Sequence, residues 1–166
     1  APLICFEDTV PHVVRDIVRT TSRVQGETKP VDCLVNLTND GWFHGSSALD
    51  QHLITAAFRA VECRTPLVRA VNTGISAYVN GDGEIVEPEV FIDADGKDRT
   101  SIRDPETGRY HKQLNAAMVH PVPLDNRGSL YVAWGDWFAG LCGLGVAFTF
   151  AGSLLPRRKP KDPHAA

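Results

Sequence analysis

The chain has 166 residues, of which 43% are hydrophobic and 22% are charged, and its formal net charge is −3. That length suits one domain with a real core, or part of a larger one. The small negative charge, with no basic stripe interleaved with aromatics, argues against a nucleic-acid partner. Four irregularly spaced cysteines, with no CxxC or HExxH motif, argue against a disulfide scaffold or a zinc site, and the sequence predicts no metal and no cofactor.

The first stretch of the chain, LICFED at residues 3–8, runs from apolar residues into a cysteine and two acids. A short apolar run is typical of a buried strand, and a strand end holds a nucleophile rigidly while exposing it. Cys5 is therefore a candidate nucleophile, because part of a cysteine is already thiolate near neutral pH. The alternative is a small buried apolar residue. The chain opens just before this strand with no methionine or leader, which predicts a piece cut from something longer.

Helix and strand patterns then alternate along the chain. Apolar residues at helical spacing predict helices over residues 10–24 and 48–64, the second capped by Ser46 or Ser47, with a polar loop over residues 25–30 between the first helix and the next strand. Apolar runs predict further strands over residues 32–38, 66–71, 74–79 and 84–86, the last two joined by the hairpin sequence NGDG. This order predicts an α/β fold.

Two polar segments interrupt the pattern. The loop NDGWFHGS at residues 39–46 is either a functional loop at a strand end or a plain turn whose aromatics cover the core. Residues 87–115 are turn-rich, but they do not make a calcium loop, because Lys97 occupies a ligand position and Asp104 stands where glutamate is needed. We expect an extended loop or hairpin there, followed by a strand over residues 116–122.

The end of the chain is strongly apolar, with no charged residue over residues 137–155. Such a span matches the thickness of a bilayer core, so the sequence predicts a membrane helix with its approach over residues 126–156. The alternative is a buried core helix. Basic residues within the tail at 157–166 predict a cytoplasmic C-terminus, with Cys5 on the opposite side of the membrane.

Taken together, ICFED, NLTNDGWF, the helix from Gln51 to Arg64, PLVRAVNTGISA, GDGEI and the apolar end resemble the C-terminal part of the apolipoprotein N-acyltransferase family, which is nitrilase-like. The resemblance implies that residues 1–125 are part of an α-β-β-α sandwich held at the outer, periplasmic face of a bacterial inner membrane. It also implies that an acyl chain passes from a phospholipid, through a thioester on Cys5, to the N-terminal diacylglyceryl-cysteine of an apolipoprotein.

The same resemblance assigns roles at the site. Cys5 is the nucleophile, the backbone N–H of Phe6 helps form an oxyanion hole, and Glu7 matches an acid that the family needs near the site, although Glu7 also suits a helix N-terminus. Asn39 and Trp42 match the loop that shapes the pocket. The resemblance gives no catalytic part to three further polar residues, which we expect at the surface or behind the site: Asp40, His44 and His52.

One departure from the family pattern matters. The resemblance implies a glutamate base and a lysine upstream of the cysteine, and only four residues precede Cys5. We therefore expect the isolated chain to be inactive and poorly soluble, and residues 87–115 match nothing in the family. The alternatives are an amidase for small amides and a membrane-anchored binding module without catalysis. Cys33 and Cys63 could pair outside the cytoplasm.

Overall fold

The structure is a computed structural model that describes residues 1–21, 31–97 and 99–154. The chain divides into two compact units, Ala1–Gly135 and Asp136–Ala166. The predicted polar loop at residues 25–30 and the basic tail at residues 157–166 lie outside the described residues.

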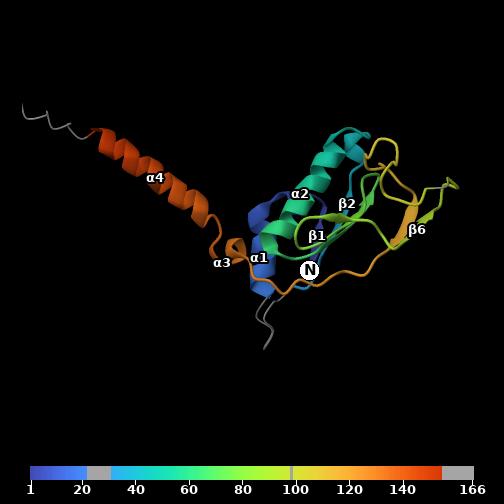
Figure 1. The fold of residues 1–166 in the computed structure, drawn as a ribbon, viewed down its shortest axis with the longest axis horizontal. Helices are drawn as coiled ribbons and strands as arrows, with labels where there is room; N and C mark the ends of the chain where they lie inside the picture. The colour runs from blue at the N-terminus through green and yellow to red at the C-terminus, as the bar shows by residue number, and fades with distance from the viewer. Residues whose placement is uncertain (22–30, 98, 155–166) are drawn as a thin grey trace, which may run out of the picture. The chain divides into compact units, whose positions relative to one another are not determined.

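A five-stranded mixed sheet forms the centre of the first unit (Figure 1). The first three strands are parallel, because β1 and β2 are each followed by a helix that returns the chain to the same end of the sheet. The last two strands are antiparallel and are joined by the predicted hairpin, where Gly83 has a positive φ of 83°. In sheet order, the strands are β1 (Pro2–Ile4), β2 (Leu34–Asn39), β3 (Leu67–Asn72), β4 (Ala77–Val79) and β5 (Ile85–Val86).

Helices α1 (Pro11–Thr21) and α2 (Ala48–Cys63) cover one face of this sheet (Figure 1). Alternate strand residues point toward these helices and make the core with them, among them Leu3, Leu34 and Leu67. The mixed sheet with its covering helices confirms the α/β part of the predicted fold class. The N-cap residue of α2 is Ser47, as one of the two predicted alternatives had it, but its side chain makes no capping hydrogen bond; Ser46 Oγ accepts one from Ala48 N at 3.3 Å.

The opposite face of the sheet is open near its first strands. Ile4 and Leu37 are register partners on β1 and β2, and each keeps about half of its side chain exposed. Farther along, Tyr78 donates a hydrogen bond to the carbonyl of Met118 at 3.0 Å. Because Ala77 and Val79 point into the cores on the helix side, Tyr78 points to this second face.

A second sheet, of two strands, is formed by residues at the two ends of the polar segment. It pairs β6 (Val90–Asp93) with β7 (Ala116–Val119) in antiparallel register. This pairing agrees with the hairpin of the two predicted alternatives, an extended loop or a hairpin. Strand β7 ends earlier than the predicted residue 122, since the prolines at 121 and 123 have no N–H to donate to a ladder.

A short helix that the sequence did not suggest, α3 (Leu130–Trp134), closes the first unit. Its N-cap is Ser129, whose Oγ accepts from Val132 N at 3.3 Å. Arg15 of α1 donates from Nε to the carbonyl of Tyr131 at 2.8 Å. These contacts fasten the end of the first unit to its helical layer.

In the second unit, the described residues form helix α4 (Trp137–Leu154). All of its side chains are exposed, and it is the one helix in the described ranges that is long and apolar enough to cross a membrane. No part of α4 is buried, so the alternative of a buried core helix is not what the structure shows.

Candidate active site

Cys5 lies on a sharp turn at the end of β1. Its φ is +52°, a left-handed conformation that costs a non-glycine residue about 1–2 kcal/mol. The chain passes directly from the strand into a short 3-10 helix, η1 (Cys5–Thr9). Cys5 is partly exposed there. The combination of a strained elbow and a thiol within reach of solvent is typical of a nucleophile rather than of a packed core cysteine.

The side chain of Glu7 makes a hydrogen bond across this elbow. One of its carboxylate oxygens, Oε2, accepts a hydrogen bond from the backbone N–H of Ile4 at 2.7 Å. The carboxylate therefore holds the start of η1, as a capping acid does. Phe6, between the two, exposes half of its side chain and stacks its ring on that of His52, with centroids 5.0 Å apart.

Asn39 lies at the same edge of the sheet as Cys5, because the carboxyl ends of parallel strands meet there and Asn39 ends β2. Its Oδ1 accepts from the hydroxyl of Thr73 at 3.1 Å and from the N–H of Gly41 at 3.2 Å. The loop beyond it contains the 3-10 turn η2 (Gly41–Phe43). Trp42, in that turn, leaves 80% of its side chain exposed. Both candidate pocket residues are thus at the edge where Cys5 emerges.

Behind the elbow lies a buried polar cluster that the sequence analysis missed. Its members are Asp8, Asp40, His52 and Arg69, all at most 3% exposed. Arg69 donates to Asp8 at 2.5 Å and to Asp40 at 2.9 Å. The two ring nitrogens of His52 face the same two carboxylates, at 2.9 Å from Asp8 and 3.0 Å from Asp40.

This cluster joins η1, the loop after β2, α2 and β3. Each ring nitrogen of His52 lies within hydrogen-bond distance of one of the two carboxylates, and Arg69 donates to both. Asp40 and His52 were expected at the surface or behind the site, and both are buried. His44, by contrast, is exposed.

Asn36 links the cluster to the nucleophile. It is fully buried on β2, and its Nδ2 donates to the backbone carbonyl of Cys5 at 3.1 Å. Its Oδ1 accepts from Arg69 Nη1 at 2.9 Å. A sequence signal existed for both residues, since the alternation of β2 and β3 places Asn36 and Arg69 on the inward face among apolar neighbours.

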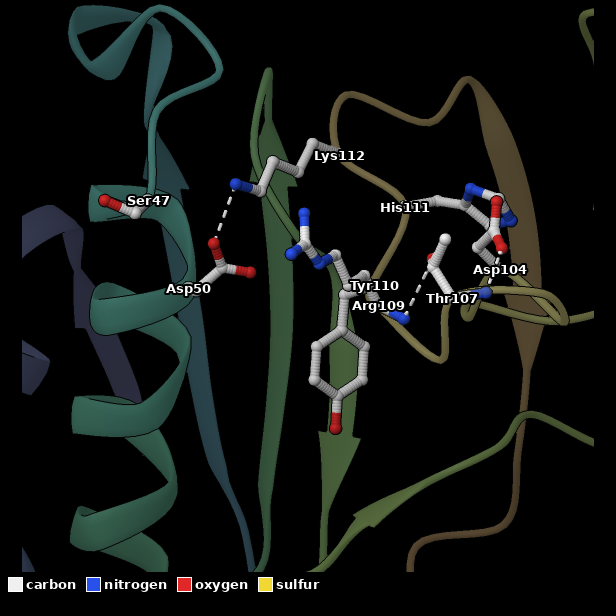
Figure 2. A pocket seen from close by; sticks show the side chains of 8 residues that line it. All are labelled: Ser47, Asp50, Asp104, Thr107, Arg109, Tyr110, His111 and Lys112. Atoms are coloured by element: carbon white, nitrogen blue, oxygen red, sulfur yellow. Dashed lines mark hydrogen bonds and ion pairs between the residues drawn. The ribbon is translucent and has the colours of Figure 1, made fainter.

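A separate cavity lies away from the elbow. It measures about 700 Å³ and lies between the start of α2 and residues 104–112 (Figure 2). Lys112 pairs with Asp50 at 2.7 Å across it. The backbone N–H of Thr107 holds the pKa of Asp104 below its usual value, and burial raises the pKa of Tyr110. None of the predicted site residues lines this cavity.

No group of three or more His, Cys, Asp or Glu side chains suited to a metal ion occurs within residues 1–21, 31–97 and 99–154. Cys33 is a free thiol that donates to the carbonyl of Leu34, so its pairing with Cys63 is not seen. Burial raises the pKa of the Cys33 thiol.

These features define an α/β protein with a cysteine on a strained elbow at the carboxyl edge of parallel strands. The chain belongs to the carbon–nitrogen hydrolase family, whose model matches residues 1–121.

Three similar proteins are each named apolipoprotein N-acyltransferase. That of Geobacter metallireducens is 37% identical over 157 residues, which is 95% of this chain and 24% of the relative. That of Rhodopirellula baltica is 33% identical over 163 residues, again 95% and 24%. That of Thermotoga maritima is 33% identical over 135 residues, 81% of this chain and 21% of the relative. The chain therefore spans about a quarter of the length of these relatives.

Proposed function

We propose that this chain is the nucleophile-bearing part of a membrane N-acyltransferase that moves an acyl chain from a phospholipid to the N-terminus of a lipoprotein. The observation that carries the proposal is Cys5, partly exposed on a strained elbow with a φ of +52°. The names and sequences of the relatives support the same chemistry.

The reaction has two half-steps. The thiol of Cys5 loses its proton and attacks the ester carbonyl, a C–S bond forms, the ester C–O bond breaks, and the departing lysophospholipid oxygen takes up the proton that the thiol lost. The free α-amine of the diacylglyceryl-cysteine then attacks the thioester, a C–N bond forms, and the thiol is regenerated as the amine loses a proton. A thioester suits this sequence because an amine attacks it readily.

Two neighbours of Cys5 assist it in this proposal. The N–H of Phe6 points toward the oxyanion that develops on the attacked carbonyl, as the group after an elbow nucleophile does. Glu7 acts near the nucleophile, and its hydrogen bond to Ile4 N supports a part in holding the elbow in its strained form.

Asn39 and Trp42 shape the acyl pocket. Trp42 presents a large exposed apolar surface at the end of the sheet where Cys5 lies, and such a surface suits contact with a lipid chain. Asn39 holds the start of that loop through its contacts with Gly41 and Thr73. Substrates of this kind, a phospholipid and a lipoprotein, call for neither a nucleic acid nor a cofactor.

The wider architecture follows from the same proposal. Residues 1–125 form part of an α-β-β-α sandwich, whose second layer would cover the exposed pair Ile4 and Leu37. Residues 87–115 are an insertion in that domain. Helix α4 with its approach, residues 126–156, crosses the bacterial inner membrane, and residues 157–166 lie in the cytoplasm, which leaves Cys5 on the periplasmic side.

The test is acyl transfer by the full-length protein in its own membranes. We expect a labelled acyl chain to move from a phospholipid to a diacylglyceryl lipopeptide, and Cys5→Ala to abolish the transfer. Activity that survives in Cys5→Ala would overturn the proposal. Hydrolysis of small amides without acyl transfer would favour the amidase, and a cellular role untouched by Cys5→Ser would favour the binding module.

A further inference from the structure

The peptide group between Cys5 and Phe6 has two ends, and the structure shows a partner for one of them. Its carbonyl, on Cys5, accepts a hydrogen bond from Asn36 Nδ2 at 3.1 Å. Its N–H, on Phe6, is the oxyanion donor of the proposed reaction. Because a peptide group is planar, fixing the direction of the carbonyl also fixes the direction of the N–H.

Asn36 is held in one orientation. Its Oδ1 accepts from Arg69 Nη1 at 2.9 Å, which leaves Nδ2 to face the Cys5 carbonyl. Since an arginine only donates, the reversed amide would place donor against donor. Arg69 is itself bound to Asp8, three residues after the nucleophile in η1. All three side chains are at most 2% exposed, so water does not compete for these bonds.

We infer that Asn36 is a positioning residue for the oxyanion hole, an inference that rests on the proposed acyl transfer. It aims the Phe6 N–H by anchoring the other end of the same peptide. The hydrogen bond to the carbonyl also polarises the peptide, which makes its N–H a better donor at the moment when negative charge develops. Asn36 touches neither substrate nor thiol in this role.

The test compares two reactions of Cys5 in the full-length protein. Acylation by a labelled phospholipid passes through a tetrahedral oxyanion, whereas alkylation by iodoacetamide is a direct displacement without one. In Asn36→Asp, the side chain keeps an acceptor for Arg69 and loses the donor to Cys5. We expect thioester formation to fall by about tenfold or more, since loss of an oxyanion donor itself costs about 10²–10³, while alkylation is unchanged.

Asn36→Leu, of similar volume and without polar atoms, is the second variant and should show the same split. The matched control is Thr65→Val. Thr65 is equally buried and donates to the Cys63 carbonyl at 3.1 Å, but it lies just before β3 begins, at the opposite edge of the sheet. Its loss should change neither reaction.

Three results would overturn the inference. Equal falls in acylation and alkylation would mean that Asn36 supports only the thiol's position. Thioester formation at the unsubstituted rate in Asn36→Asp would mean that the carbonyl anchor is irrelevant. A protein without substitutions that is alkylated normally but never acylated would fail the proposed function itself, and the inference with it.

Discussion

Arg69 and Asp8 form an ion pair in which both side chains are 0% exposed, with Nη1 and Oδ2 2.5 Å apart. Arg69 also pairs with Asp40 at 2.9 Å. Removing one partner of such a cluster leaves charges buried without compensation, which is far more costly than losing a surface pair. The elbow that holds Cys5 therefore depends on an arginine on a different strand.

We expect Arg69→Met to destabilise the fold by about 3–5 kcal/mol. The matched control is Arg127→Met, because Arg127 also pairs with two aspartates, Asp82 and Asp125, but is half exposed. Its loss should cost much less stability, because solvent screens an exposed ion pair. The measurement is the urea denaturation midpoint of each variant in detergent. Similar midpoints for the two variants would show that the buried cluster does not stabilise the fold.

The hairpin between β4 and β5 depends on a glycine for two reasons at once. Gly83 has a φ of +83°, and a Cβ at this position would lie 2.3 Å from Val61 Cγ2 of α2. Gly96 has a φ of +67°, but a Cβ there would meet no atom within 4 Å beyond its chain neighbours. We expect Gly83→Ala to cost about 1–3 kcal/mol more than Gly96→Ala, because only the first adds overpacking. Equal thermal unfolding temperatures for the two variants would contradict this.

The β6–β7 sheet should weaken in acid. Hydrogen bonds from Arg99 lower the pKa of Asp93 from 3.8 to about 2. Because the folded pKa is the lower one, the pair's contribution is fully present above about pH 4 and is lost as the pH falls through 2. The protection factors of the Ile92 and Ala117 amides should therefore drop between pH 4 and pH 2. Arg99→Gln should remove this dependence, and an unchanged dependence in that variant would assign it to another group.

Two cysteines of the first unit should differ in reactivity. Both thiols are partly exposed, but partial burial raises the pKa of Cys33, which lowers its thiolate fraction at neutral pH, and Cys5 lies on the strained elbow. At pH 7.5 we expect iodoacetamide to modify Cys5 before Cys33, with the Cys33 rate still rising above pH 9. Peptide mass mapping after timed quenching measures both rates. Faster modification of Cys33 would contradict the assignment of Cys5 as the reactive thiol.

Local patterns in the sequence were enough to predict most of the elements near the site. The apolar run before Cys5, the helical spacing behind Ser47 and the NGDG turn each act over a few residues, and the structure has a strand, a helix and a hairpin at these places. The predicted ends of the elements were less accurate. The strand predicted to reach residue 122 ends at Val119, where prolines remove backbone donors.

The buried cluster escaped prediction because it depends on long-range pairing. Asp8 and Arg69 are 61 residues apart, and only the parallel register of β1, β2 and β3 brings them together. The inward position of Arg69 in an apolar strand was a readable signal of a buried charge, but its partners were not. Helix α3 was missed because five residues carry too little periodicity.

The most direct test of the account is the intact mass of the native protein extracted from membranes, before and after treatment with neutral hydroxylamine. The account predicts a fraction whose mass exceeds that of the polypeptide by one fatty acyl group, mapped to the peptide containing Cys5 and removed by hydroxylamine. Cys5 found only as a free thiol, in membranes that contain the phospholipid donor and from which the lipoprotein acceptor is withheld, would contradict the claim that this residue carries the acyl chain.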